Sequence, residues 1–370
     1  MMRSIVVIVL IGILICILII GSFLIIRSSG KSKDFLDSRG NKIENSISEK
    51  AYVEINGVRQ GMFIKSKDIN NPVLLFVHGG PIMPEYFLND NYPTGLEDYF
   101  TICWWEQPGV GLSYNSNISK EDLTVDSIVE DTIEVTNYLR QRFKQEKIYL
   151  LGHSWGTFIA LQAAYIKPEL YNAYIGMGQI TNQSKSEKSA YEYMMNKYLQ
   201  INDKKMYNKL KEYKINESND ELIRYFKSSV RDTAMHELGI GTIHDMSSVF
   251  SGIFMPVMNC SEYTITEKIN IWRGKSYVKN NTTLINDFLF ADMPSKIPEL
   301  KIPCYFISGI YDYTVSWKLA EEYYEKINAP IKGFYLFNNS AHSPMFEEPN
   351  KFIDIMLNDV MKEKSDLTDF

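Results

Sequence analysis

Two features of the sequence predict an α/β fold with a doubly wound, mostly parallel sheet. Apolar runs such as 72–77 and 100–105 end in glycine-containing turns, and segments with helical spacing alternate with them. This alternation with short loops is typical of parallel sheets that are covered by helices on both faces. A third feature is a stretch without strand-like runs, residues 178–295, which predicts a helical cap between two parts of one sheet domain, 51–177 and 296–370.

The composition excludes several classes of protein. The 370 residues include 39 Lys and Arg against 45 Asp and Glu, a net charge of −6, and no basic block indicates a nucleic-acid partner. The four cysteines lie far apart without a CxxC pair, and no two of the five histidines have metal-ligand spacing. We therefore expect no metal, no cofactor and no disulfide framework.

The N-terminus predicts a membrane anchor. Residues 4–26 contain no charge and are mostly Ile, Leu and Val. As a helix they would reach about 35 Å, enough for a hydrocarbon core of roughly 30 Å. A cleaved signal peptide is the alternative, but its apolar core usually spans only about 7 to 15 residues before a small-residue cleavage site. A buried core helix is a third option. We expect a single-pass membrane protein.

Two arguments about the side of the membrane on which the folded domain lies point in opposite directions. Basic residues between Arg27 and Lys42 favour a cytoplasmic location for the domain on their C-terminal side, but long domains translocate largely regardless of charge. We expect the catalytic domain outside the cytoplasm. Residues 27–50 are polar, without an apolar period, and predict a linker.

The first part of the sheet domain can be divided into elements. Residues 51–64 alternate around Asn56-Gly57, a strong hairpin signal. Apolar strands and helices with a 3.6-residue period come next, and Asp126 is expected to cap the first helix. The expected strands are 72–77, 100–105, 147–151 and 174–177, and the expected helices are 126–143 and 157–166.

The second part of the sheet domain repeats this pattern after the cap. Strands are predicted at 304–307 and 334–337, and helices at 317–326 and 351–362. Each of the two strands is followed by a polar turn, and these turns contain Asp312 and His342.

The sequence Gly152-x-Ser154-x-Gly156 fits a nucleophile elbow, in which a sharp turn between strand and helix lifts a serine hydroxyl above the sheet edge. A serine hydroxyl is a poor nucleophile unless a nearby base takes its proton. Asp312 and His342 come later in the chain in the order serine, acid, histidine, each after a strand. We therefore predict a triad in which His342 takes the proton of Ser154 and Asp312 orients the imidazole.

Acyl transfer also requires hydrogen-bond donors for the oxyanion. The backbone N–H of Trp155, directly after the serine, is one candidate. The second is the N–H of Gly80, in the His78-Gly79-Gly80-Pro81 loop that comes after a buried strand. We expect His78 to hold this loop in place rather than to act as a base.

These motifs resemble the α/β-hydrolase fold and, within it, the proline iminopeptidases. The likeness covers about residues 51–365, and its pieces are His78-Gly79-Gly80-Pro81, Trp105 to Ser113, Gly152 to Gly156, Gly309 to Asp312 and Ala341-His342-Ser343. The resemblance implies an aminopeptidase that acts on short peptides through an acyl-enzyme and binds the free amine with acidic cap residues. Glu187, Glu192, Glu237 and Glu262 are candidates, and none of them can be assigned as substrate-binding.

Two positions depart from the family's pattern. Ile82 stands where the family usually has Gly, and Pro108 stands where it usually has Arg. The predicted function is a membrane-anchored serine hydrolase of proline iminopeptidase type. An esterase or lipid-acting hydrolase with the same triad is the alternative, for which an apolar cap set, Phe250, Phe254, Met255 and Met258, would bind acyl chains. A non-catalytic binding protein on the same scaffold is a third reading.

Overall fold

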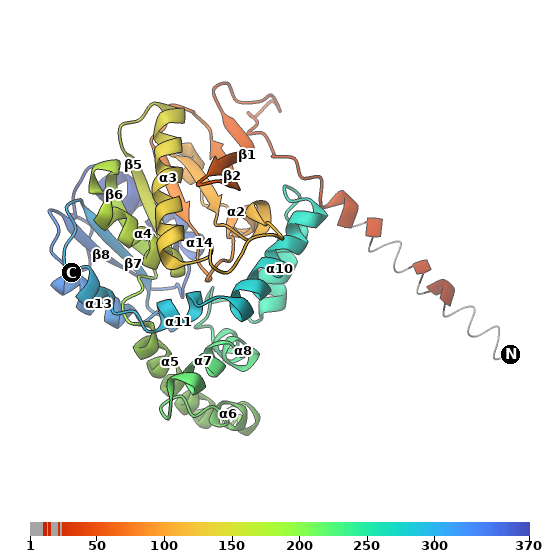
Figure 1. The fold of residues 1–370 in the computed structure, drawn as a ribbon, viewed down its shortest axis with the longest axis vertical. Helices are drawn as coiled ribbons and strands as arrows, with labels where there is room; N and C mark the ends of the chain where they lie inside the picture. The colour runs from red at the N-terminus through yellow and green to blue at the C-terminus, as the bar shows by residue number, and fades with distance from the viewer. Residues whose placement is uncertain (1–9, 13, 16–20, 23) are drawn as a thin grey trace.

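An eight-stranded sheet forms the centre of the protein in the part of the chain that the structure, a computed structural model, describes: residues 10–12, 14–15, 21–22 and 24–370 (Figure 1). The strand order is β1-β2-β4-β3-β5-β6-β7-β8. The first two strands are antiparallel, and all pairs from β4 to β8 are parallel. The strands are β1 (Ile47–Ile55), β2 (Val58–Ser66), β3 (Val73–Val77), β4 (Thr101–Glu106), β5 (Ile148–His153), β6 (Tyr171–Met177), β7 (Cys304–Gly309) and β8 (Lys332–Phe337).

The predicted doubly wound α/β sheet is confirmed. The hairpin turns at Asn56 (φ 49°) and Gly57 (φ 79°), two consecutive left-handed residues as a two-residue turn of the mirror-image type requires. Strands β3, β4, β5 and β7 are buried along their whole length. Helices therefore cover both faces of the sheet, which explains why these strands appear in the sequence as continuous apolar runs.

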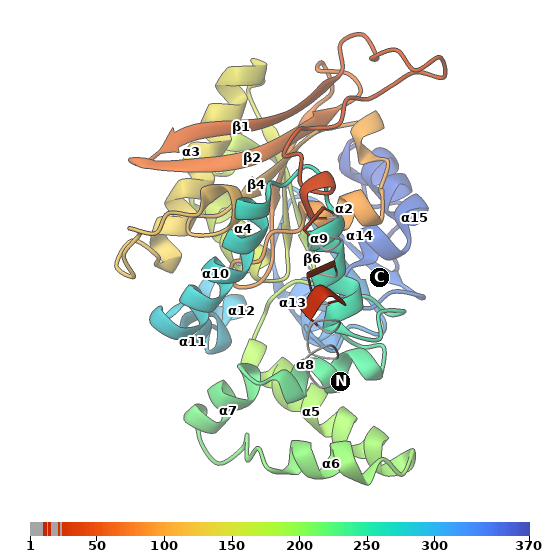
Figure 2. The same ribbon diagram turned by 90° about the vertical axis from the view of Figure 1, so that its right-hand side faces the viewer.

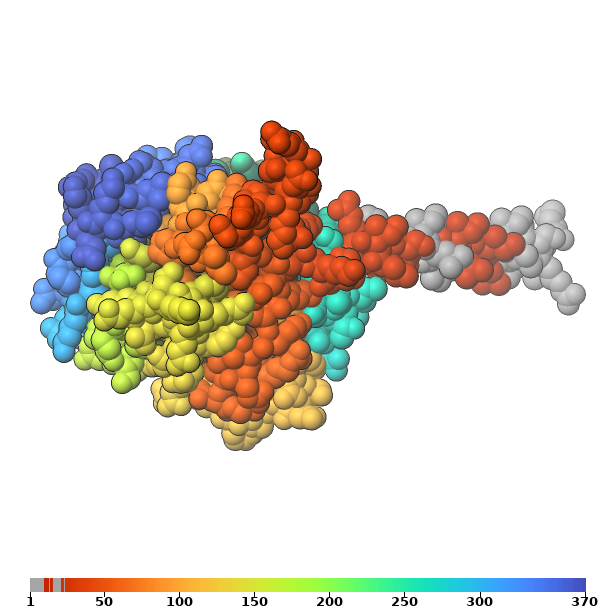
Figure 3. Space-filling model, turned by 90° about the horizontal axis from the view of Figure 1, so that it is seen from above, coloured from red at the N-terminus to blue at the C-terminus, as the bar shows by residue number. Residues whose placement is uncertain are grey.

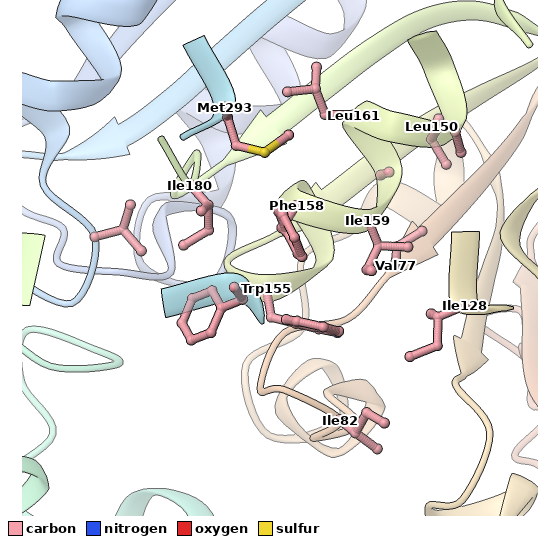
Figure 4. Packing of buried hydrophobic residues seen from close by; sticks show 14 of the residues in the cluster. Val77, Ile82, Ile128, Leu150, Trp155, Phe158, Ile159, Leu161, Ile180 and Met293 are labelled. Atoms are coloured by element: carbon pink, nitrogen blue, oxygen red, sulfur yellow. The ribbon is translucent and has the colours of Figure 1, made fainter. Parts of the chain in front are cut away.

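Helices on the two faces of the sheet pack over two separate hydrophobic cores. Successive residues of a strand alternate between them: Leu75 and Val77 belong to one core, Leu74 and Phe76 to the other. Figure 4 shows part of the first core around Trp155, Phe158 and Ile159. The helices on this face are α3 (Val125–Phe143), α4 (Trp155–Ile166) and α13 (Trp317–Lys326); those on the other are α2 (Tyr86–Asn91), α14 (Pro344–Glu347) and α15 (Pro349–Ile355), which continues as the π-helix η5 (Met356–Val360).

The N-cap of α3 differs from the prediction. Thr124, not Asp126, precedes the helix, and its side-chain oxygen accepts the N–H of Ser127 at 3.1 Å. Ser127 in turn accepts the N–H of Thr124 at 3.0 Å, which completes a capping box. Asp126 lies in the first turn, where a carboxylate is favourable next to the helix dipole.

The segment between β6 and β7 is helical, as residues 178–295 predict. Figure 2 shows α5 to α8 as a layer beyond the end of the sheet, with α10 running alongside the sheet domain. The cap helices are α5 (Gln183–Gln200), α6 (Lys204–Lys211), α7 (Asn219–Phe226), α8 (Ser229–Glu237), η4 (Phe250–Phe254), α9 (Met255–Asn259), α10 (Ile265–Asn281), α11 (Leu284–Leu289) and α12 (Met293–Lys296).

The predicted membrane span lies partly outside the described residues, because 4–9, 13, 16–20 and 23 are not described. The described pieces of this segment are helical, extend away from the body (Figure 3) and expose apolar side chains, namely Leu10, Ile11, Leu14, Ile15, Ile25 and Ile26. Within the described part of the chain, no helix has the length and apolar character needed to cross a membrane.

The segment predicted as a linker, residues 27–50, contacts the cap at its start and enters the sheet at its end. Lys268 on α10 donates to the carbonyl of Arg27 at 2.5 Å and to Ser28 Oγ at 2.9 Å. The N–H of Gly30 donates to the carbonyl of Ser261 at 3.0 Å, and β1 already begins at Ile47. Most residues between 31 and 46 are exposed, which accounts for the polar composition of this segment.

Candidate active site

Ser154 occupies the sharp turn between β5 and α4. Its backbone has φ 54° and ψ −124°, a conformation that non-glycine residues adopt rarely and mostly where function requires it. A Cβ on Gly156 would lie 1.9 Å from the carbonyl oxygen of Val77, and one on Gly152 would lie 2.6 Å from that of Gly156. Only glycine fits at these two positions, which is the physical basis of the Gly-x-Ser-x-Gly pattern.

The structure brings the three predicted triad residues to the same place. Asp312 comes after β7, His342 comes after β8, and both side chains are buried. His342 Nδ1 lies 2.8 Å from Asp312 Oδ2. Asp312 is itself held by the N–H of Val315, which donates to Oδ1 at 2.9 Å. Ser154 and His342 line the same cavity, at the carboxyl ends of the parallel strands.

The loop that carries His342 is held by a carboxylate that the sequence did not indicate. Glu347 Oε1 accepts the N–H groups of Ala341 at 3.0 Å and Ser343 at 3.1 Å, one on each side of the histidine. Glu347 Oε2 accepts the N–H of His244 in the cap at 2.6 Å. Burial raises the pKa of Glu347 to about 7 although these hydrogen bonds lower it. One side chain therefore joins the cap to the histidine loop.

A second buried carboxylate, Glu85, was also missed by the sequence analysis. Its Oε1 accepts the N–H of Gly79 at 2.7 Å, and its Oε2 lies 2.7 Å from His153 Nδ1. His153 Nε2 lies 2.8 Å from the carbonyl oxygen of His342. Burial disfavours charge on both groups, but their mutual attraction and hydrogen bonds lower the pKa of Glu85 and raise that of His153. The two form a buried ion pair next to the serine.

The two predicted oxyanion donors are free in the described structure. Neither the N–H of Trp155, the first residue of α4, nor that of Gly80 has an acceptor among the described residues. Gly80 has φ 134°, and a Cβ there would lie 2.2 Å from the nitrogen of Ile82, so the loop requires glycine. Ile82, which replaces the family's usual Gly, is also left-handed (φ 55°), with its side chain fully buried.

His78 and Gln107 hold the loop that contains Gly80. The N–H of Gln107 donates to His78 Nε2 at 3.0 Å, and Gln107 Nε2 donates to the carbonyl of His78 at 2.9 Å. The indole Nε1 of Trp155 donates to Gln107 Oε1 at 2.9 Å. Burial lowers the pKa of His78 to about 4. His78 is therefore a neutral acceptor that fixes the loop, as expected from the sequence.

A cavity of about 210 Å³ lies between the sheet domain and the cap. This volume is below the roughly 300–1,000 Å³ of typical small-molecule sites, which favours a small substrate. The sheet domain contributes Gly80, Pro81, Met83, Glu85, Phe87, Leu88, His153, Ser154, Thr314 and His342. The cap contributes Phe226, Lys227, Arg231, Asp232, Met235, His236, Thr242, Val249, Ile253, Lys275, Val278, Lys279 and Ile285.

The four cap glutamates considered as amine ligands do not line this cavity. Glu187 is buried against Arg231, Glu262 against Lys65, and Glu237 accepts from the hydroxyl of Tyr198, while Glu192 is exposed. The carboxylates in the cavity wall are instead Asp232 of α8 and Glu85. The apolar set considered for acyl chains, Phe250, Phe254, Met255 and Met258, is likewise absent from the wall.

Residues 72–349 match the family described as alpha/beta hydrolase fold. The chain belongs to this family. The α/β hydrolase is 30% identical to "Probable aminopeptidase YbaC" of Bacillus subtilis over 321 residues, which cover 85% of this chain and 96% of that protein. It is 26% identical to a "Proline iminopeptidase" of Clostridium botulinum, covering 78% of this chain and 89% of the relative.

Solved structures share the fold at lower sequence identity. The α/β hydrolase matches a proline iminopeptidase-related protein of Thermus thermophilus with a TM-score of 0.56 at 16% identity, over 85% of this chain and 98% of that one. A proline iminopeptidase of Mycobacterium smegmatis matches with a TM-score of 0.58 at 13% identity, over the same shares of the two chains. The predicted resemblance is confirmed, and the protein is a hydrolase that is similar to proline iminopeptidases.

Proposed function

We propose that this α/β hydrolase is a serine aminopeptidase that releases the N-terminal residue of short peptides. The observation that carries the proposal is the His342–Asp312 pair, 2.8 Å apart, which faces the same cavity as Ser154 at its elbow. A serine becomes an effective nucleophile only when a positioned base takes its proton, and the acid holds that base in the required tautomer.

The proposed reaction has two halves. Ser154 Oγ attacks the scissile carbonyl carbon and its proton passes to His342 Nε2, while the N–H groups of Gly80 and Trp155 bind the oxyanion. His342 then gives the proton to the leaving amine, the C–N bond breaks, and an acyl-enzyme ester remains on Ser154. Water, deprotonated by His342, attacks this ester and releases the N-terminal amino acid, which restores the serine.

The aminopeptidase form of the proposal requires a ligand for the free amine of the substrate. Asp232 is the carboxylate that the cap presents to the cavity. One of its oxygens, Oδ1, accepts from Arg231 Nη1 at 2.9 Å, and its side chain is 44% exposed, so it retains capacity for a second cation. The relatives named as aminopeptidases and proline iminopeptidases support this choice of reaction.

An esterase remains a second candidate because part of the wall is apolar. Met83, Phe87, Leu88, Val249 and Ile253 line the cavity and would suit an acyl chain. The two functions share the triad and differ only in whether the substrate needs a free amine.

Fluorophosphonate labelling, combined with a panel of L-proline β-naphthylamide, L-alanine β-naphthylamide and p-nitrophenyl esters, tests the proposal. We expect labelling that is lost in Ser154→Ala, and arylamide cleavage that requires a free amine. Ester cleavage alone, with arylamides tested at equal sensitivity, would favour the esterase. Absence of labelling in the folded protein, or equal turnover by Ser154→Ala, would remove the serine hydrolase assignment.

We also infer that residues 4–26 anchor the enzyme in a membrane, with the catalytic domain outside the cytoplasm. The uncharged sequence supports this inference, as do the exposed apolar side chains of the described helical pieces. The full chain is expected to stay with membranes through carbonate extraction, and a chain that begins at Arg27 to be released. Release of both would contradict the anchor. Protease accessibility in intact cells tests the side of the membrane.

A further inference from the structure

The cap wall of the cavity carries more positive than negative charge. Lys227, Arg231, Lys275 and Lys279 line it, and Asp232 is its only carboxylate among the described residues. This distribution is unexpected for a site that binds only a substrate amine, because a cationic wall repels an ammonium group. The charges in this wall therefore indicate a second recognition element.

Two of these cations already have partners. Arg231 donates from Nε to Glu187 Oε2 at 2.7 Å and from Nη2 to Glu187 Oε1 at 2.6 Å, in addition to its bond with Asp232. Lys279 Nζ donates to the carbonyl of Lys227 at 2.5 Å. These contacts hold α8, α10 and the end of α7 in place, which fixes the shape of the cap wall.

The ammonium groups of the other two cations, Lys227 and Lys275, have no recorded partner in the described structure, and Lys275 is the one that lies within a helix, α10. Within the described structure Lys275 has neither a hydrogen-bond acceptor nor an ion-pair partner, and its nearest recorded contact is the Trp272 ring, with the centroid 6.0 Å from Nζ. Burial lowers the pKa of Lys275, against the attraction of Asp232, and the positive charges of Lys279 and Arg231 lower it further. An unpaired ammonium in a partly buried wall is costly, and an anionic ligand group would offset that cost.

Asp232 and Lys275 face the same cavity from α8 and α10 and form no ion pair with each other. Two opposite charges that are held apart in one small cavity match a zwitterion, with its ammonium at Asp232 and its carboxylate at Lys275. A dipeptide or tripeptide carries both groups within a few bond lengths. In a long peptide the terminal carboxylate would lie outside a cavity of about 210 Å³.

We propose that Lys275 binds the α-carboxylate of a di- or tripeptide substrate, so that the enzyme prefers short peptides with a free C-terminus over their C-terminal amides. This inference rests on the proposed aminopeptidase function and narrows its substrate class. Lys275 acts on binding, because it belongs to the cap wall rather than to the group of residues around Ser154.

The test compares L-prolyl-L-alanine with L-prolyl-L-alaninamide on the wild-type enzyme, Lys275→Gln and Lys209→Gln. Lys209 is an exposed lysine of α6 outside the cavity wall and serves as the matched control. A charge-assisted hydrogen bond is worth about tenfold or more in affinity, so we expect the wild-type kcat/KM to favour the acid by about that factor. Lys275→Gln should abolish this preference through KM on the acid alone, and Lys209→Gln should retain it.

Equal kcat/KM for acid and amide in the wild-type enzyme would overturn the inference, even if Lys275→Gln failed to fold. An equal loss on both substrates would also overturn it, because it would indicate a structural role for Lys275. Hydrolysis of neither substrate would count against the proposed aminopeptidase function. Calorimetric titration of both ligands into Ser154→Ala, with and without Lys275→Gln, then decides the inference separately: binding of the acid that depends on Lys275 supports it, and equal binding of both ligands refutes it.

Discussion

The carboxylate of Glu85 lies 2.7 Å from the Nδ1 of His153, and this pair joins three loops of the candidate site. His153 directly precedes Ser154, and its other ring nitrogen lies 2.8 Å from the carbonyl oxygen of His342. The second oxygen of Glu85 accepts the N–H of Gly79, next to the proposed oxyanion donor Gly80. The serine, the histidine and the oxyanion loop are therefore positioned relative to one another by one buried ion pair.

We expect Glu85→Gln to destabilise the protein and to lower kcat with little change in KM. The variant keeps the size of the side chain but leaves His153 without its counter-charge, and breaking a buried pair costs about 3–5 kcal/mol. Because the pKa of Glu85 is lowered on folding, its charge stabilises the fold fully above about pH 4.5, the ordinary pKa of a glutamate. Because the pKa of His153 is raised, its charge stabilises the fold fully below about pH 6.5, the ordinary pKa of a histidine. The difference from wild type should therefore be largest between pH 4.5 and 6.5.

Urea unfolding across this pH range measures the effect, with the exposed Glu192→Gln as control. A Glu85→Gln protein as stable as wild type at pH 5.5 would contradict the description of Glu85 and His153 as a charged pair.

The stability of Glu106→Gln relative to the wild type should increase as the pH rises. The carboxyl of Glu106 is buried, accepts the N–H of Leu112 at 2.6 Å and contacts the hydroxyl of Tyr263. Burial raises its pKa from 4.5 to about 8. The folded state therefore holds a proton that the unfolded state has lost, and the stability of the wild type falls as the pH rises from 4.5 to 8.

The amide in Glu106→Gln does not titrate in this range. The free energy of unfolding of the variant, relative to the wild type, should therefore rise with pH by at most about 5 kcal/mol, at 1.36 kcal/mol per pKa unit. Thermal or urea unfolding of the two proteins between pH 4.5 and 8.5 measures the difference. A constant difference over this range would show that Glu106 has the same pKa in the folded and unfolded states.

Ile82→Gly should destabilise the protein although it restores the glycine that is usual in related sequences. The left-handed backbone at φ 55° costs an isoleucine about 1–2 kcal/mol, which glycine would recover. The Ile82 side chain is fully buried in the same hydrophobic core as Trp155 (Figure 4), and removing it should cost more than the 2–5 kcal/mol of an isoleucine-to-alanine change. We expect a net loss of about 1–3 kcal/mol in the free energy of unfolding, and a gain in stability would refute this balance.

Asp232→Asn should raise KM for L-proline β-naphthylamide by about tenfold or more and leave cleavage of p-nitrophenyl acetate unchanged. The change removes the charge proposed to bind the substrate amine, and hydrogen bonds to charged groups are worth about 1.5–3 kcal/mol. Arg231 keeps its two bonds to Glu187, so the cap should stay folded. An equal loss on both substrates would indicate a structural role, which circular dichroism can detect.

The sequence was sufficient to predict the sheet and the three residues of the proposed triad, because their signals are local. A buried parallel strand is a run of apolar residues. The elbow requires glycine at two positions, because a Cβ at either one would clash with a nearby backbone atom. Ser154, Asp312 and His342 follow the carboxyl ends of β5, β7 and β8, which gives their order in the chain.

The cap wall and the supporting carboxylates could not be predicted in the same way. Glu85 meets His153 from 68 positions away, and Glu187 meets Arg231 from 44 positions away, so no local pattern distinguishes them from other glutamates. Asp232 and Lys275 face one cavity only because α8 and α10 both border it in the folded cap. The polar segment 27–50 resembles a linker for a related reason: the cap residues that its first part contacts, Ser261 and Lys268, lie more than 200 residues further along the chain.

Helix α10 connects the N-terminal segment to the cavity. Lys268 binds the backbone where that segment meets the body, and Lys275 stands seven residues further along the same helix, about 10 Å away and nearly two full turns on. Because α10 is one continuous helix, the contact with the N-terminal segment and the cavity-lining Lys275 belong to the same element. The N-terminal segment and the wall of the cavity are thus joined through a single helix of the cap.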